Sequence, residues 1–235
     1  MDDGLQRVFS RRHVVLPVVH VESEHQARRN TDLARRAGAD GVFLINHFSD
    51  GEDLLAIHRK VSEDHPDWWI GVNCLDLDPP EVFQAVNDRV SGIWVDHAGI
   101  DEREDEQPLA DEAAAARERS GWVGLYFGGV AFKYQRPVED LTRAARLAVR
   151  YMDVVTTSGP GTGIAAAREK IAAMKQAVGG FPLAIASGIT PENVSDYLDV
   201  ADCFLVATGI SRSFTELDLE KTRRLIERVD AYAGR

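Results

Sequence analysis

The sequence predicts a single (β/α)₈ barrel domain over residues 1–235, with residues 1–12 as an N-terminal extension. Apolar runs of strand length alternate with helical patterns eight times, which is the order of elements in a closed parallel barrel. A weak repeat, in which a small or acidic residue precedes an apolar run, recurs at residues 39–42, 152–155 and 201–204. A doubly wound open sheet is the alternative. No GxGxxG motif follows the first apolar run, which counts against a dinucleotide site of the Rossmann type.

The expected strands are short apolar runs that end in polar or glycine residues. They cover residues 13–21, 42–45, 68–75, 92–95, 122–127, 153–157, 183–187 and 203–207. The first run is rich in valine and does not alternate apolar with polar residues. This pattern is typical of a strand that is buried on both faces.

The expected helices follow these runs. The first stops at Gly38, the third opens at Pro79-Pro80, and the seventh starts at Thr190-Pro191, with Thr as the N-cap. The set covers residues 24–37, 52–61, a segment from 79 onward, 110–119, 138–150, 165–178, 190–198 and 217–232. Between the fourth strand and the fourth helix, the acidic segment 101–111 is expected to be a solvated loop.

Composition narrows the partners and the compartment. The net charge of −11 argues against nucleic acid, because binding a phosphate backbone needs a basic face. No apolar run reaches the length of a membrane span and residues 1–12 lack a signal-peptide core, so we expect a cytoplasmic protein. Cys74 and Cys203 lie in expected strands without a disulfide or CxxC pattern, which fits a reducing compartment. A homo-oligomer, most simply a homodimer, is expected on general grounds.

The ends of the last three strands predict a phosphate site. Two of them carry Ser187-Gly188 and Thr208-Gly209. Glycines let the backbone approach an anion closely, and exposed N–H groups there can converge on its oxygens. Gly161 and Thr162, before the sixth helix, would add a third wall. Ordinary barrel turns are the alternative, but the clustering on successive loops, where barrels hold phosphate, favours the phosphate site.

Candidates for acid/base chemistry lie at the ends of the earlier strands, because barrel active sites occupy this face. His20 with Glu22, and Asp96 with His97, are the candidate pairs. Adjacent strand residues point to opposite sides, so only one of Asp96 and His97 needs to face the cavity.

Lys133 is a candidate electrophile or anion clamp. A Schiff base is an alternative role, weakened by the position of Lys133 several residues beyond the strand. Asn46 and Asn73 are expected to line the reacting end with it. A metal site built from His20, Asp96 and His97 has no supporting spacing motif, and no metal or other cofactor is expected.

Several of these pieces, in this order, resemble the BtpA/SgcQ family of phosphate-binding barrels. The most specific are SGITPENV at 187–194 and ADCFLVATG at 201–209, and others include Val18-Val19-His20, residues 38–42, residues 70–75 and Phe132-Lys133. The resemblance implies a TIM barrel and either a sugar-metabolism protein or a factor in photosystem I biogenesis. The family usually has an acidic residue before Asn46 and a Lys in the loop after Thr208. Here Arg212 would stand in as the cation near the phosphate.

Two functions remain open. The first is an enzyme that acts on a small phosphorylated metabolite, a sugar phosphate or a phosphoribosyl or nucleotide-like compound. Isomerase, lyase or glycosyl-bond cleavage chemistry would each suit an acid/base barrel without a redox cofactor. The second is a non-catalytic assembly or regulatory factor that keeps the phosphate pocket as a sensor.

Overall fold

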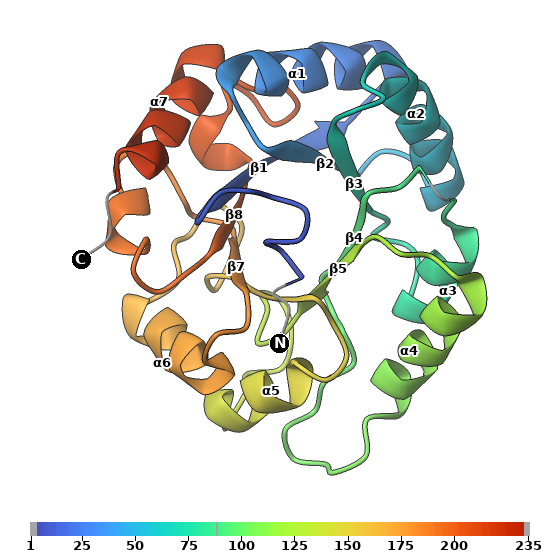
Figure 1. Cartoon of the computed structure of the whole chain (residues 1–235), viewed down its shortest axis with the longest axis vertical. Helices are drawn as coiled ribbons and strands as arrows, with labels where there is room; N and C mark the ends of the chain where they lie inside the picture. The colour runs from blue at the N-terminus through green and yellow to red at the C-terminus, as the bar shows by residue number, and fades with distance from the viewer. Residues whose placement is uncertain (1–3, 88, 233–235) are drawn as a thin grey trace.

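In the computed structural model, which describes residues 4–87 and 89–232, eight parallel strands close into a barrel in sequence order (Figure 1). The strands are β1 Val14–Val21, β2 Gly41–Asn46, β3 Trp69–Asn73, β4 Gly92–Val95, β5 Leu125–Gly129, β6 Val154–Thr157, β7 Leu183–Ala186 and β8 Cys203–Val206. Pairing of Val14 with Cys203 begins the β1–β8 register that closes the barrel. The expected (β/α)₈ fold is confirmed.

Seven α-helices among the described residues surround the barrel. They are α1 Glu24–Ala37, α2 Gly51–Asp64, α3 Pro79–Ala85, α4 Pro108–Ser120, α5 Leu141–Ala148, α6 Arg168–Val178 and α7 Leu219–Asp230. Several begin as their sequence predicts: the side chains of Asp50, Asp140 and Asp218 each accept a hydrogen bond from a backbone N–H in the first turn.

The seventh expected helix, at residues 190–198, is wrong. After β7 the chain forms turns and a single 3₁₀ turn, η1 Val194–Asp196. Ser195, Asp196 and Asp199 occupy this short segment, and such side chains compete with the helix for backbone hydrogen bonds. A second 3₁₀ turn, η2 Thr208–Ile210, directly follows β8.

The barrel interior is filled by a cluster of large side chains, among them Phe43, Trp69, Trp94, Phe127 and Leu205. The Phe43 ring packs edge-on against Trp69 at 5.0 Å and Phe127 at 5.2 Å. Two glycines make room for these rings, because a Cβ on Gly71 would lie 2.5 Å from Phe43 and one on Gly92 would lie 2.2 Å from Trp69.

The N-terminal extension closes one end of this core. Leu5 and Phe9 are buried in the interior cluster, and the Phe9 ring lies 5.6 Å from Trp69, the first residue of β3. In Figure 1 this dark blue segment crosses the barrel opening. The extension thus covers the barrel at the N-terminal ends of the strands. The face left open for a ligand is the opposite one, at the carboxyl ends of the strands.

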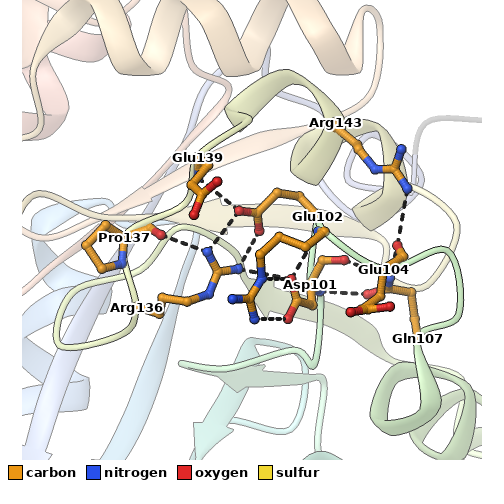
Figure 2. Close-up of polar contacts among 9 residues, drawn as sticks. Asp101, Glu102, Glu104, Gln107, Arg136, Pro137, Glu139 and Arg143 are labelled. Atoms are coloured by element: carbon orange, nitrogen blue, oxygen red, sulfur yellow. Dashed lines mark hydrogen bonds and ion pairs between the residues drawn. The ribbon is translucent and has the colours of Figure 1, made fainter.

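The acidic segment 101–111 is only in part the solvated loop that its composition suggests. The side chain of Glu102 is 2% exposed and forms an ion pair with Arg136, which lies on the loop after β5 (Figure 2). Gln107 is also buried and donates to the backbone carbonyls of Asp101 and Glu104. Pairing with a distant arginine explains why an acidic residue lies inside.

No helix in the described ranges is long and apolar enough to cross a membrane.

Candidate functional site

A cavity of about 280 Å³ lies at the carboxyl ends of the barrel strands. Its lining is mostly apolar, with side chains such as Ile45, Trp94 and Leu205. The polar side chains in the lining are His20, His47, Asp96, Lys133, Tyr134, Thr162, Ser187 and Thr208. A mostly apolar cavity with few converging polar groups is typical of a small-molecule site.

Asp96 and Lys133 form the charged pair of this cavity. Asp96 follows β4, and its Oδ2 lies 4.0 Å from Nζ of Lys133, which follows β5. This distance exceeds a hydrogen bond, so both groups keep hydrogen-bonding capacity for a ligand atom. Burial raises the pKa of Asp96, while Lys133 and the side chain of Asn73 oppose the rise. A carboxyl whose pKa moves toward neutrality is suited to general acid/base work.

Four neighbours fix the positions of this pair. Asn73 Nδ2 donates to Asp96 Oδ1 at 3.0 Å, which orients the carboxylate. The Gln135 side chain donates to the Asp96 carbonyl at 2.5 Å, which joins the loops after β4 and β5. The Lys133 backbone N–H donates to Ser158 Oγ at 2.7 Å, and its Nζ lies 4.5 Å from the centre of the Phe132 ring.

His20, at the end of β1, is 8% exposed and lines the cavity. Burial, with a smaller contribution from His47, lowers the pKa of His20 to about 4. The imidazole is therefore neutral at neutral pH, with one nitrogen that donates and one that accepts. Its ring lies 4.7 Å from that of His47 and 4.2 Å from that of Phe214.

The glycine-rich ends of β7 and β8 form the opposite wall. Gly188 has φ +73° and Ser187 has φ +119°, so the backbone turns sharply here. A Cβ on Gly209 would lie 2.0 Å from the Ile189 carbonyl oxygen, so the two loops touch through bare backbone. Gly209 sits in the first turn of η2, where N–H groups lack partners within the helix.

The loop before α6 completes this wall. Ser187 Oγ donates to the Gly161 carbonyl at 3.2 Å, which ties the loop to the end of β7. Thr162 and Gly163 line the cavity, and the Thr162 backbone N–H donates to the Tyr134 hydroxyl at 3.1 Å. Gly161 itself lies behind the lining.

Of the residues expected to act, the cavity brings together His20, Asp96, Lys133, Thr162, Ser187, Gly188, Thr208 and Gly209. Asn73 stands behind Asp96. Asn46 instead holds loops: its side chain donates to Asp76 at 2.6 Å and accepts from the Leu75 N–H at 2.7 Å. Arg212 also lies outside the lining, with a side chain 61% exposed and paired with Glu216. Glu22 is exposed and does not line the cavity beside His20.

His97 lies beyond the end of β4, apart from Asp96, and lines a separate cavity beside Gly99 and Arg136. It therefore cannot join His20 and Asp96 around one ion. Within the part of the chain that the structure describes, no group of three or more His, Cys, Asp or Glu side chains could hold a metal ion.

Sequence reasoning did not choose His47 as a site residue, and it missed Trp94, Tyr134 and Phe214 as cavity residues. His47 stands next to Asn46 at the end of β2, so the strand-end pattern contained it. Tyr134 follows Lys133 directly but has φ +62°, an uncommon conformation that sequence does not reveal. Phe214 lies seven residues beyond Ala207, and no local signal places it over β1.

The model of the BtpA family matches residues 126–231, from β5 to α7, and the resemblance seen in the sequence motifs is thereby confirmed. An uncharacterized protein of Thermococcus kodakarensis is 28% identical, over 86% of this chain and 84% of its own.

Solved structures of low sequence identity share the fold. Phosphoribosyl anthranilate isomerase from Thermus thermophilus superposes with a TM-score of 0.65 and 19% identity, covering 93% of this chain and 98% of its own. Geranylgeranylglyceryl phosphate synthase from Thermoplasma acidophilum, solved with its substrate sn-glycerol-1-phosphate, gives a TM-score of 0.70 and 14% identity, with 97% of each chain covered. At these identities the likeness establishes the TIM-barrel architecture.

Proposed function

We propose that this chain, which matches the BtpA family over residues 126–231, is an enzyme that acts on a small phosphorylated metabolite by acid/base chemistry. The observation that carries the proposal is one cavity that joins the glycine-rich ends of β7 and β8 to the Asp96–Lys133 pair. The names of the structural relatives, an isomerase and a synthase of phosphorylated compounds, are in keeping with it.

In this proposal the phosphate lies against Ser187, Gly188, Thr208 and Gly209. Gly161 and Thr162 support it from the loop before α6, and Arg212 remains a more distant cation. Backbone N–H groups and η2 would bind the anion without a neighbouring arginine. This suits a chain of net charge −11, whose partner would be a single phosphate and not a nucleic acid.

The reacting end lies across the cavity. Asp96 would remove or return a proton, and its raised pKa brings it closer to the working pH. Lys133 would stabilise negative charge that develops on the substrate. Neutral His20 would donate or accept a hydrogen bond, while Asn73 and Asn46 orient the groups around them. Isomerisation, lyase chemistry and glycosyl-bond cleavage all use these roles, and none of them needs a redox cofactor.

A screen of phosphorylated sugars and nucleotides by thermal shift tests the site. A ligand at 100 times its dissociation constant should stabilise the fold by about 2.7 kcal/mol. Asp96→Asn and Lys133→Met should abolish turnover of any compound that binds, while Lys60→Met, an exposed lysine on α2, should not. A compound that binds but is not turned over, and whose affinity is the same in both variants, would favour the non-catalytic sensor. No shift with any phosphate compound would exclude both functions.

We further propose that the protein is a cytoplasmic homodimer. The support for the compartment is that Cys74 and Cys203 are both free and buried. Size-exclusion chromatography with light scattering tests the oligomeric state.

A further inference from the structure

One side of the cavity is built from rings. His20, His47 and Phe214 line it together, and the Phe214 ring lies 4.2 Å from His20 and 5.2 Å from His47. Phe214 is 53% exposed and lies at the edge of the cavity. Ile45 and Trp94 continue the apolar surface inward. A flat group bound here would cover the exposed ring of Phe214.

Two residues of this lining, His20 and Trp94, each carry a buried polar atom without a partner. His20 Nδ1 and Trp94 Nε1 have no hydrogen-bond partner among the described residues, although their residues are only 8% and 3% exposed. Buried polar atoms are nearly always paired, and each unpaired one calls for a reason. Trp94 Nε1 is a donor, and neutral His20 can donate or accept. A bound group with polar atoms in its ring would pair with these atoms after the two side chains rotate toward the cavity.

Phe214 is held in place by buried amides on α1. Gln26 and Asn30 are 3% and 0% exposed, and both side chains donate to the carbonyl of Thr215, next to Phe214. Asn30 Oδ1 also accepts from the Leu217 N–H at 2.7 Å, and Gln26 Nε2 reaches the His20 carbonyl at 3.2 Å. The same two side chains thus fix the backbone beside Phe214 relative to that of His20 before any ligand arrives.

We propose that this side of the cavity is a subsite for a planar, hydrogen-bonding ring, and that the ligand joins such a ring to a phosphate, as a nucleoside monophosphate does. The phosphate half of this statement rests on the proposed function. The ring half rests on His20, Trp94 and Phe214. The cavity of about 280 Å³ is at the small end of ligand sites, which commonly span about 300–1,000 Å³, so one mononucleotide is favoured over a dinucleotide.

Calorimetric titrations of the whole chain separate the two halves. The probes are adenosine and uridine 5′-monophosphate, the two nucleosides without phosphate, and ribose 5-phosphate without a base. We expect a nucleotide to bind about tenfold or more tightly than ribose 5-phosphate, since stacking of a base on aromatic side chains commonly contributes this much. Phe214→Ala should remove this advantage and leave the affinity for ribose 5-phosphate unchanged. Phe214→Tyr should preserve it.

Phe48→Ala is the matched control. Phe48 is 59% exposed and its ring lies 6.0 Å from Phe214, but it does not line the cavity, so its removal should leave nucleotide affinity unchanged. Equal affinities for nucleotides and ribose 5-phosphate would overturn the ring subsite and leave the phosphate site standing. Binding of nucleosides alone, with no gain from phosphate, would refute the phosphate site and retain the ring subsite. No binding by any of these probes would overturn both.

Discussion

Glu102 accepts two hydrogen bonds from the guanidinium of Arg136, at 2.9 Å and 2.6 Å, across the loops that follow β4 and β5 (Figure 2). Glu102 Oε1 also accepts from the Glu139 backbone N–H at 2.9 Å. A carboxylate held by two parallel N–H donors has a fixed geometry. These loops carry Asp96 and Lys133. The ion pair therefore helps to fix the position of these two charged groups relative to each other.

Replacing Glu102 by Gln should destabilise the protein by about 2 kcal/mol, the usual contribution of hydrogen bonds to a charged group. Chemical denaturation measures the change. Glu104→Gln is the control, because Glu104 uses its backbone carbonyl, not its exposed side chain, to accept from Gln107 and Arg143. Equal stability of the two variants would show that the Glu102–Arg136 pair does not hold the loops.

Buried histidines should make the fold sensitive to mild acid. Burial lowers the pKa of both His20 and His58 to about 4, from an ordinary value of 6.5. In the unfolded chain these groups take up protons near pH 6.5, whereas in the folded chain they stay neutral down to about pH 4. Above pH 6.5 the free energy of unfolding should therefore keep the whole contribution of this pair, and it should fall as the pH drops toward 4. Between these pH values the slope should correspond to the uptake of roughly two protons on unfolding, one for each histidine.

His58→Gln should reduce that slope by roughly one proton, because His58 is fully buried on α2 and its Nε2 meets the Ile70 carbonyl. Denaturant titrations at several pH values between 4 and 7 measure it. The exposed His25 is the control, and His25→Gln should keep the slope of the parent protein. A flat pH profile of stability in the parent protein would contradict the assignment of this acid sensitivity to buried histidines.

The barrel itself could be predicted because each strand can be recognised from a short stretch of sequence. Each is a short apolar run buried on both faces, such as Val14–Val21, where all eight residues are buried. The exceptions involve partners far apart in the sequence. The acidic composition of its segment predicts that Glu102 is exposed to solvent. Its burial is explained only by the ion pair with Arg136, 34 residues away. The missing helix after β7 reflects a short segment whose polar residues favour turns.

In the candidate site, too, the sequence predicts what depends on neighbouring residues and misses what depends on distant ones. Only one of Asp96 and His97 lines the cavity, as expected, but both lie beyond the end of β4, and the sequence could not say that it is Asp96. Asn46 ends a strand as expected, yet its amide is used to hold the loop at Leu75. Phe214 could not be foreseen, because two amides on α1 hold its loop over β1.

Gly209→Ala should weaken binding of ribose 5-phosphate at least about tenfold if the β7 and β8 loops hold the phosphate. An added Cβ would lie 2.0 Å from the Ile189 carbonyl oxygen, so the two loops must move apart and their N–H groups would no longer converge. Gly180→Ala is the control, because nothing lies within 4 Å of its Cβ position. Calorimetry measures both, and full affinity in Gly209→Ala would place the phosphate elsewhere.

Asn30→Ala tests whether α1 positions Phe214. The change removes an acceptor from the Leu217 N–H and a donor to the Thr215 carbonyl, and should destabilise the protein by about 2 kcal/mol. Local loosening should appear as faster hydrogen exchange at Leu217 than in the parent, with exchange in the barrel strands changed only by the global loss. The gain in affinity that Phe214 gives to nucleotides over ribose 5-phosphate should shrink in the same variant. If Leu217 exchanges no faster than the strands while the nucleotide preference persists, the loop is held by other contacts, such as Arg29 with Glu216, and Asn30 serves only the stability of α1.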